Sequence, residues 1–428
     1  MRLIYTIGIW FYTLGIRIAA MFGHSKASLM VRGWRDCLKA DTGNTETIKH
    51  SSNQAIKTAW FHAASLGEFE QARPVLEAYR ERHPEARIVV TFFSPSGYEV
   101  RKNYALADRV LYLPPDLPRE VRRFVDSYRP TVAFFVKYEF WYNYLEALHK
   151  RHIPTYIFSA IFREGQYFFR SWGGWYLRQL RDCFGHLFVQ NEASKLLLEG
   201  HGLQRVSVAG DTRYDRVHQI AQEAKPNAVV EQWLSAQPKG KTLVMGSSWE
   251  PDETLVSRYL QEENPALNLI IAPHVISEEH LRKIEQLFPG SVRYSVLKNQ
   301  TNQNTPNNLN ILRSTLIIDN IGLLSQLYRY ADVAYIGGGF GAGIHNILEA
   351  VAYGKPVLFG PRYTKFQEAC DIIDLGGGWS HTDYTTFVRN LTPLLSDPTA
   401  YARAAQACHG LMQRNLGSTE LILNTLEE

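Results

Sequence analysis

With 428 residues, 45% of them hydrophobic and 21% charged, the chain is too long for one ordinary core and predicts two globular domains of about 200 residues each. The net charge of +4 is concentrated in the first 40 residues, which hold six basic residues and one acidic residue, and this excludes the basic folded face typical of a nucleic-acid binder. The four cysteines lie far apart without a CxxC pair, which excludes that metal or redox signature and favours a reducing, cytoplasmic setting.

Residues 1–40 begin with an apolar run, Leu3–Phe22, that is interrupted by Arg17 and followed by basic residues. A cleaved signal peptide needs a small-residue cleavage site, and none is evident here. The run is just long enough to span a bilayer, and it also suits a helix in the interface with Trp10 at headgroup depth. We predict a membrane-docking segment, spanning or interfacial, with the protein body on the cytoplasmic side. A helix buried in the first domain is the alternative.

Residues 41–57 are polar and lack periodicity, so they predict a linker. From residue 58 onward, short apolar runs alternate with helix-length segments, which indicates parallel strands joined by crossover helices. We therefore predict an α/β fold of two Rossmann-like, doubly wound domains, residues 58–220 and 221–428, with ligands at the carboxyl ends of the strands.

Three charged residues in the first domain follow predicted strands. Glu68 is expected in the first turn of a helix after the run at 58–63, where it is either a general base or an acid favoured by the helix dipole. Glu139 follows the run at 131–136 and is either a reactive carboxylate or a helix cap. Arg213 lies near the domain boundary, where it binds phosphate or carboxylate, or pairs with Asp215 on the surface.

In the second domain a predicted strand runs into a glycine-rich loop, which includes Gly338 and Gly339, and then into a predicted helix. Glycines let backbone N–H groups approach a phosphate, and a helix N-terminus adds positive potential. Asn346 and Glu349 are one helical turn apart, so both are expected at a bound nucleotide, with Glu349 on its ribose hydroxyls. The alternative is a tight strand-to-helix turn without a ligand.

Taken together, five segments resemble the Kdo transferases, which attach 3-deoxy-D-manno-octulosonic acid to lipid A precursors. They match the motifs of that family in chain order: HAASLGE at 62–68, EFWYN at 139–143, GDTRYD at 210–215, GSSWEPDE at 246–253 and HNILEAVAYGKPVLFGP at 345–361. The resemblance implies a GT-B fold of two facing domains, with a lipid acceptor in the first and CMP-Kdo in the second.

The resemblance also implies roles for single residues. Glu68 matches the catalytic base of the family, and Glu139 and Arg213 match its charged pair near the transition state. The segments that match its CMP contacts comprise Pro273, His274, Ile321, Gly322, Leu323, Asn346, Ile347, Leu348 and Glu349. The sequence departs from the family at four places. It has His274 where the family usually has Arg, Arg213 where it has Lys, Tyr142 where it has Pro and Leu323 where it often has Glu.

The implied reaction is an inverting displacement at the anomeric carbon of Kdo, with Glu68 taking a proton from a glucosamine hydroxyl of lipid IVA. No metal and no other cofactor is expected, and the sequence holds no Asp-x-Asp cluster. The implied place is the cytoplasmic face of the inner membrane, in lipopolysaccharide biosynthesis. Two alternatives stay open: a nucleotide-sugar epimerase or another GT-B transferase, and a membrane-docked scaffold without activity.

Overall fold

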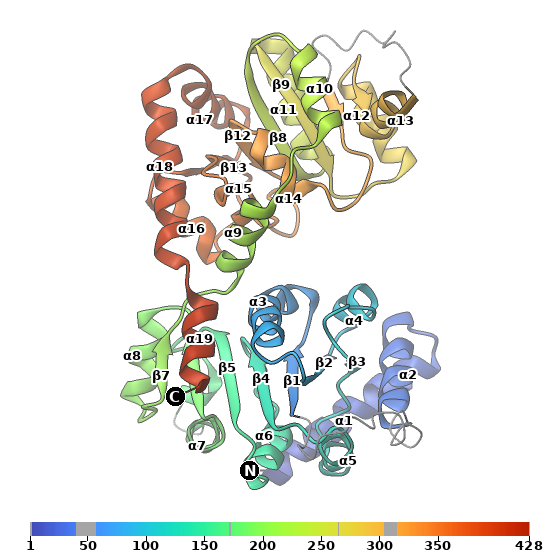
Figure 1. Cartoon of the computed structure of the whole chain (residues 1–428), viewed down its shortest axis with the longest axis vertical. Helices are drawn as coiled ribbons and strands as arrows, with labels where there is room; N and C mark the ends of the chain where they lie inside the picture. Colours follow the sequence, from blue (N-terminus) through green and yellow to red (C-terminus); the bar gives the residue numbers. More distant parts are fainter. Residues whose placement is uncertain (1, 40–56, 171–172, 264, 304–314, 428) are drawn as a thin grey trace. The chain divides into compact units, whose positions relative to one another are not determined.

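The computed structural model describes residues 2–39, 57–170, 173–263, 265–303 and 315–427. The chain divides into two compact units: unit 1 comprises residues 1–216 and 417–428, and unit 2 comprises residues 217–416 (Figure 1). Each unit contains a parallel seven-stranded sheet with helices packed against it. The predicted α/β class with doubly wound sheets is therefore confirmed. The predicted linker at 41–57 lies, except for residue 57, outside the described residues.

The strands of unit 1 form where the sequence has short apolar runs, and alternate side chains enter the two faces of the sheet. Trp60 and Phe135 pack with the helices of one face, whereas Phe61 and Phe134 pack with those of the other. The sheet order is β3-β2-β1-β4-β5-β6-β7. The strands are β1 (Thr58–Ala63), β2 (Arg87–Phe92), β3 (Arg109–Tyr112), β4 (Val132–Val136), β5 (Thr155–Ala160), β6 (His186–Val189) and β7 (Val206–Val208).

Helices cover both faces of this sheet, as Figure 1 shows. One face is packed by α3, and the other by α5, α6 and α7. The helices of this part of the chain are α3 (Leu66–Arg82), α4 (Pro95–Arg101), α5 (Pro118–Tyr128), α6 (Tyr142–Lys150), α7 (Gly174–Cys183), α8 (Glu192–Gly200) and α9 (Arg213–Glu223), with a 3-10 turn, η1 (Tyr167–Phe169), before α7.

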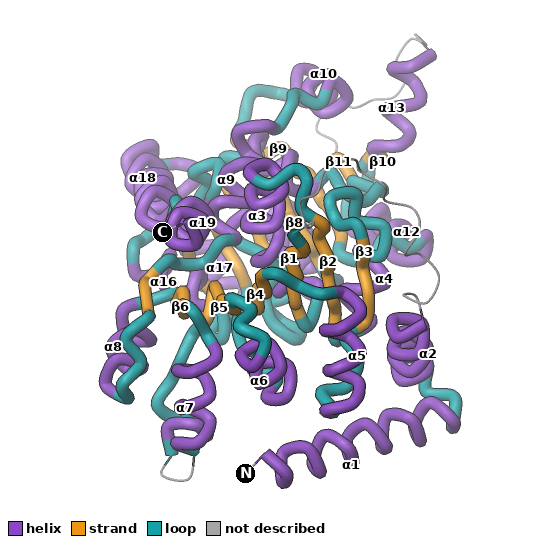
Figure 2. Tube along the Cα trace, turned by 60° about the horizontal axis from the view of Figure 1, so that its bottom comes forward, coloured by secondary structure: helices purple, strands orange, loops and turns teal. Residues whose placement is uncertain are grey.

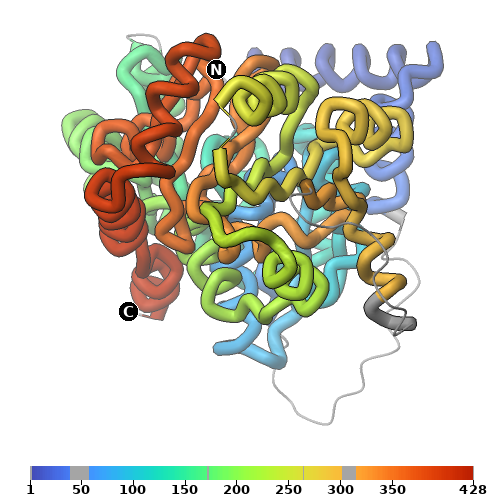
Figure 3. Tube along the Cα trace, turned by 90° about the horizontal axis from the view of Figure 1, so that it is seen from above, coloured from blue at the N-terminus to red at the C-terminus, as the bar shows by residue number. Residues whose placement is uncertain are grey.

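The N-terminal segment forms two helices, α1 (Arg2–Met21) and α2 (Ser25–Lys39), which pack against each other (Figures 2 and 3). Two of the buried side chains of α2, Met30 and Trp34, pack on Tyr112 of β3. In α1 only Thr13 is fully buried, and the rest of the helix is largely exposed. The alternative of a helix buried in the first domain is therefore wrong for α1.

The chain returns to unit 1 at its C-terminal end. Helix α19 (Ser418–Glu427) packs on α3, and its Ile422 and Leu423 enter the core beside Phe61. Asp215 accepts hydrogen bonds from the backbone N–H groups of Gly417 and Thr419, at 2.8 and 2.7 Å. The predicted second domain, 221–428, thus differs at its end from unit 2, because residues 417–428 bury their apolar side chains in unit 1.

Unit 2 repeats the architecture, with the order β10-β11-β9-β8-β12-β13-β14. Helices α11, α12 and α17 bury apolar side chains against the sheet. Its strands are β8 (Lys241–Ser248), β9 (Leu267–Pro273), β10 (Val292–Arg293), β11 (Thr315–Ile317), β12 (Val333–Ile336), β13 (Val357–Phe359) and β14 (Gly378–Ser380). Its helices are α10 (Ala228–Ala236), α11 (Glu250–Glu263), α12 (Glu278–Leu287), α13 (Tyr294–Gln303), α14 (Leu324–Leu327), η2 (Tyr328–Tyr330), α15 (Leu348–Val351), α16 (Gln367–Asp374), α17 (Tyr384–Ser396) and α18 (Pro398–Asn415).

Candidate functional site

The sheet of unit 1 has its switch point between β1 and β4, because strand order runs outward in opposite directions from this pair. Open α/β sheets bind ligands at the carboxyl ends of the strands at such a point. Glu68 follows β1 and Glu139 follows β4, so the two predicted carboxylates lie at the ends of adjacent strands. The structure thus brings these two predicted residues together.

Glu68 lies in the first turn of α3, as the sequence predicts, but its carboxylate turns back towards the strand. Its Oε2 accepts a hydrogen bond of 2.6 Å from the backbone N–H of Ala64. The hydroxyl of Ser65, the residue before the helix, makes no capping hydrogen bond within the described part of the chain. Burial and the nearby carboxylate of Glu139 raise the pKa of Glu68 to about 7, against opposing effects of the Ala64 N–H, His62 and Lys137. Burial and the charge of Glu139 therefore outweigh the hydrogen bond from Ala64 and the charges of His62 and Lys137 at this carboxylate.

Glu139 does not cap the helix that follows it, which was one of the two interpretations of its sequence position. Its Oε2 contacts Nε2 of His62 at 3.0 Å and accepts a hydrogen bond of 2.6 Å from the indole N–H of Trp141. Lys137, between β4 and Glu139, has a left-handed backbone with φ of 64°. Such a conformation is strained for a lysine and redirects the chain at the strand end.

His62 is a site residue that the sequence analysis does not name, although it opens the motif HAASLGE. It is fully buried at the end of β1. Its Nδ1 lies 2.9 Å from Oγ1 of Thr91 and 3.1 Å from the carbonyl oxygen of Thr91 on the neighbouring strand β2. These contacts orient the ring so that its other nitrogen faces Glu139. The signal in the sequence is a lone ionisable residue in an otherwise apolar strand, because such a group needs partners when buried.

Arg213 begins α9, and its guanidinium pairs with Asp211. Nε and Nη2 of Arg213 lie 3.0 and 2.8 Å from Oδ2 of Asp211, which also accepts a hydrogen bond of 3.0 Å from Gln71 of α3. Burial alone would raise the pKa of Asp211, but the charge and hydrogen bonds of Arg213 hold it below its usual value. Asp215, the other partner considered for Arg213, accepts hydrogen bonds from the backbone at the start of α19.

In unit 2 the switch point lies between β8 and β12. The glycine-rich loop with Gly338 and Gly339 follows β12, and Trp249 follows β8. The buried carboxylate of Asp252 connects the two, because its Oδ2 accepts hydrogen bonds of 3.0 Å from the backbone N–H groups of both Trp249 and Gly338. The predicted nucleotide loop therefore lies where an open α/β sheet keeps its ligand site.

Two positions in this loop favour glycine for structural reasons that do not involve a ligand. A Cβ atom on Gly339 would lie 2.6 Å from Cα of Gly360, and Gly338 has a φ of +90°. The helix after the loop is also shorter than predicted: α15 covers only Leu348–Val351, with Asn346 outside it. Within this turn Nδ2 of Asn346 donates to Oε1 of Glu349 at 3.2 Å. Asn346 and Glu349 are thus close together, as expected, but only Glu349 lies in a helix, and that helix is short.

Pro273 ends β9, and the ring of the next residue, His274, belongs to a stack of three rings. The ring centroid of His274 lies 4.2 Å from that of His345 and 4.8 Å from that of Trp249. The indole N–H of Trp249 donates to Nε2 of His345 at 3.1 Å. Burial and the adjacent His274 lower the pKa of His345 to about 4, so this ring is neutral at pH 7. His274 is predicted from the sequence as a nucleotide contact, whereas His345 and Trp249 are not.

The remaining predicted contacts also lie at this edge of the sheet. Ile321, Gly322 and Leu323 follow β11, the strand beside β9, and the side chain of Ile321 is 91% exposed. In contrast, Ile347 and Leu348 are fully buried, so only their backbone groups are available to a ligand. Among the described residues, no group of three or more His, Cys, Asp or Glu side chains is arranged to hold a metal ion.

Comparison with known proteins finds Kdo transferases among the relatives of this chain. The family model described as 3-Deoxy-D-manno-octulosonic-acid transferase (kdotransferase) matches residues 38–216, ending where unit 1 first ends. A 3-deoxy-D-manno-octulosonic acid transferase of Aquifex aeolicus is 25% identical over 354 residues, 81% of this chain and 89% of that protein. That of Bordetella pertussis is 25% identical over 382 residues, 86% of each chain. The chain is thus similar to Kdo transferases over most of its length.

Solved structures show a likeness in fold over most of the chain. The UDP-GlcNAc 2-epimerase of Neisseria meningitidis, bound to UDP-GlcNAc, superimposes with a TM-score of 0.58 at 16% identity, over 87% of this chain and 99% of that chain. A putative UDP-N-acetylglucosamine 2-epimerase of Listeria monocytogenes gives 0.53 at 13% identity, over 83% and 92%. At such identity the likeness shows only the fold, which is GT-B with two Rossmann-like domains.

Proposed function

We propose that this protein moves Kdo from CMP-Kdo to a lipid A precursor, lipid IVA, with inversion at the anomeric carbon. The observation that carries the proposal is the pair Glu68 and Glu139 at the switch point of unit 1. A general base works best when its pKa lies near the working pH, and burial beside Glu139 raises the pKa of Glu68 to about 7.

In the proposed reaction Glu68 takes the proton from a sugar hydroxyl of the acceptor. The hydroxyl oxygen forms a bond to the anomeric carbon of Kdo while the bond from that carbon to the phosphate oxygen of CMP breaks. CMP leaves with the electron pair, and attack from the opposite side inverts the configuration. Glu139, held by His62 and Trp141, and the charge of Arg213 would stabilise the charge that develops.

Donor binding is assigned to the switch point of unit 2. The backbone around Gly338 and Gly339 is ordered by Asp252, and the neutral rings of His274 and His345 lie beside it. We propose that these groups and Glu349 hold the nucleotide, and that transfer needs no metal. Chelator treatment should leave the transfer rate unchanged, and loss of activity that added Mg²⁺ restores would refute the metal-free proposal.

Membrane docking is supported by the apolar exposed side chains of α1. This helix is long and apolar enough to cross a membrane by length and composition alone, with a mean hydropathy of 1.5. Apart from Tyr12, whose ring stacks on Phe93, the exposed large apolar side chains of residues 2–22 are Leu3, Ile4, Ile7, Trp10, Phe11, Leu14, Ile18, Met21 and Phe22. Exposed apolar surface of this kind is typical of a membrane interaction site.

Because the opposite side of α1 hydrogen-bonds to unit 1, we propose that the helix lies in the interface rather than spanning the bilayer. The exposed Arg17, Lys26, Arg32 and Arg35 would bind anionic lipid at the cytoplasmic face of the inner membrane. Ile7→Glu should lower binding to vesicles that contain anionic lipid, and added salt should weaken binding of the parent protein. Unchanged binding of the Ile7→Glu variant would place the docking surface elsewhere.

The deciding experiment is product analysis with CMP-Kdo and a lipid A precursor. A Kdo-containing lipid and free CMP are expected, and the anomeric configuration of the product tests inversion. An epimerase would instead change the configuration of a free nucleotide sugar without forming a lipid product. A scaffold would bind the lipid and turn nothing over, and either result would reject the proposed reaction.

A further inference from the structure

The face of α1 that turns towards unit 1 is tied to the loop that carries Glu139. The hydroxyl of Tyr5 donates a hydrogen bond of 2.7 Å to Oδ2 of Asp116, a fully buried carboxylate. The same carboxylate accepts hydrogen bonds of 3.0 and 2.9 Å from the backbone N–H groups of Asn143 and Tyr144. These N–H groups lie in the first turn of α6, where the helix itself provides no acceptor. Tyr5 and the start of α6 are therefore held by one carboxylate.

Asn143, the last residue of the motif EFWYN, is bound to the first turns of α1 in two further ways. Nε of Arg2 donates to its Oδ1 at 3.1 Å, and its Nδ2 lies 3.3 Å from the hydroxyl of Thr6. Nδ2 of Asn143 also donates to the carbonyl of Asp116 at 2.7 Å. The end of the Glu139 loop thus has its side-chain hydrogen bonds with α1 and with Asp116.

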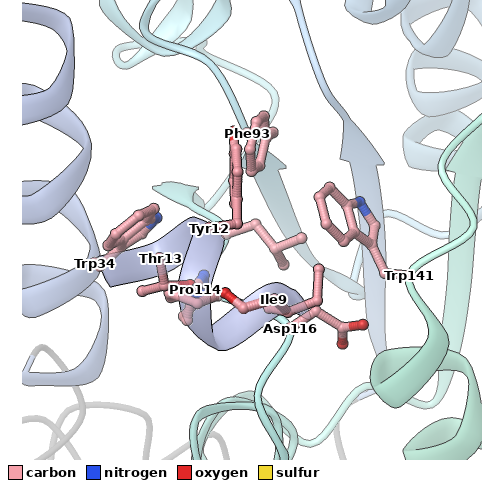
Figure 4. Close-up of a pocket in the computed structure, with 10 residues that line it drawn as sticks. Ile9, Tyr12, Thr13, Trp34, Phe93, Pro114, Asp116 and Trp141 are labelled. Atoms are coloured by element: carbon pink, nitrogen blue, oxygen red, sulfur yellow. Dashed lines mark hydrogen bonds between the residues drawn. The ribbon is translucent and has the colours of Figure 1, made fainter. Parts of the chain in front are cut away.

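A series of rings connects the middle of α1 to Glu139 itself. The ring of Tyr12 is stacked with that of Phe93, with centroids 6.3 Å apart, and Phe93 lies 5.1 Å from Trp141. The indole N–H of Trp141 donates to Glu139. Figure 4 shows Tyr12 and Phe93 side by side, with Trp141 across the apolar recess that they line together.

The two faces of α1 therefore differ in what they contact. Arg2, Tyr5, Thr6 and Thr13 turn towards unit 1 at helical spacing. Trp10 of the same helix is 52% exposed and packs against Phe11. One helix thus carries both the proposed membrane contact and contacts to the loop of the proposed active site.

We infer that α1 is a positioning element of the active site and that Tyr5 and Tyr12 are positioning residues that hold Glu139 in place opposite Glu68. The inference rests on the proposed transfer reaction and extends it, because it makes the rate of transfer depend on the contacts between α1 and the rest of unit 1. A displacement of about 1 Å at a reacting group lowers a rate by up to roughly a hundredfold, so a loosened loop has a measurable effect.

The test separates turnover from membrane binding. Tyr5→Phe removes only the hydroxyl that binds Asp116, and Tyr12→Leu removes the ring that stacks on Phe93. Both variants should lower transfer from CMP-Kdo to a detergent-dispersed lipid A precursor by roughly ten- to a hundredfold. The acid limb of the pH profile should move to lower pH, because Glu139 would act less strongly on Glu68. Vesicle binding should stay within about twofold of the parent protein.

Two matched variants serve as controls on the same helix. Tyr12→Phe keeps the stacked ring and should restore transfer relative to Tyr12→Leu. Trp10→Ala should weaken vesicle binding and leave transfer in detergent unchanged. Parent-like rates and pH profiles in Tyr5→Phe and Tyr12→Leu would overturn the inference, and so would a loss of rate with an unmoved pH profile.

Hydrogen exchange of the backbone amides of residues 139–144 gives a readout that does not depend on the reaction. Exchange should be faster in Tyr5→Phe, because Asp116 loses one partner beside the amides of Asn143 and Tyr144. If the parent protein transferred no Kdo but these amides exchanged faster in Tyr5→Phe, the proposed reaction would be rejected. The contact between α1 and the loop would still be supported. Parent-like exchange in Tyr5→Phe would refute the positioning role whatever the reaction.

Discussion

The two switch points of this protein are built from different kinds of groups. That of unit 1 carries ionisable side chains in direct contact, with Glu139 bound to His62 and Trp141 and close enough to Glu68 to raise its pKa. That of unit 2 offers backbone N–H groups around Gly338 and the ring of His345, which is neutral at pH 7. In the proposed function, proton transfer belongs to the first switch point and nucleotide binding to the second, and the groups at the strand ends account for this difference between two parallel seven-stranded sheets.

The largest expected effect is that of Glu68→Gln. The change keeps the shape of the side chain but removes its ability to accept a proton, so transfer should fall by about 10²–10⁴-fold. CMP affinity, measured by calorimetry, should be unchanged. Glu81→Gln, on the exposed side of the same helix, is the matched control and should keep full activity. Near-normal single-turnover transfer by Glu68→Gln would remove Glu68 as the base and make Glu139 the next candidate.

Glu349→Ala tests the binding role of unit 2. Loss of a hydrogen bond to a charged group should weaken CMP binding by about 1.5–3 kcal/mol. The melting temperature should change little, because the side chain is only partly buried. Glu279→Ala, on the exposed surface of α12, controls for loss of a negative charge in the same unit. Equal CMP affinity in parent and Glu349→Ala would exclude Glu349 from the nucleotide site.

Gly339→Ala asks whether the glycine loop has room for any side chain. The added Cβ would meet the backbone of Gly360 at 2.6 Å, so the loop or β13 has to shift, at an expected cost of about 1–3 kcal/mol of stability. Gly341→Ala is the control, because its Cβ would come no closer than 3.5 Å to the neighbouring atoms. Thermal melts should show a lower melting temperature for Gly339→Ala than for Gly341→Ala. Equal melting temperatures would contradict the packing explanation.

The pH dependence of transfer is expected to be the smallest but most specific effect. Glu68 accepts a proton only when ionised, so the rate should rise with pH up to about 7 and then level off. Because its pKa is raised above the ordinary value of 4.5, ionising Glu68 lowers folding stability as pH rises through this window. In Glu139→Gln the midpoint should move to lower pH, and an unmoved midpoint would show that Glu139 does not act on Glu68.

Much of the fold could be predicted from the sequence, because buried parallel strands are continuous apolar runs. The run at 58–63 coincides with β1, and that at 131–136 contains β4. Strand β10 is two residues long and β14 has the sequence Gly-Trp-Ser, so neither has an apolar run to reveal it. The place of α19 could not be predicted either, since nothing local in its sequence tells which core its Ile422 enters.

The site was predictable where a residue follows a strand, as Glu68 and Glu139 do. Contacts between strands were not, and His62 shows why: its role depends on Thr91 and Glu139, which lie 29 and 77 residues away in sequence. Trp249 and His345 were missed for the same reason, as they meet only when β8 and β12 pair. The length of α15 was overestimated because its helical pattern continues into residues that form turns in the structure.

The return of α19 to unit 1 has a consequence for the order in which the protein folds during synthesis. Unit 2 is one continuous stretch, residues 217–416, and all of it has been translated before the codons of α19 are read. Most of unit 1 precedes unit 2 in the chain, yet its core lacks Ile422 and Leu423 until those residues have left the ribosome. Unit 1 is therefore begun before unit 2 but completed after it.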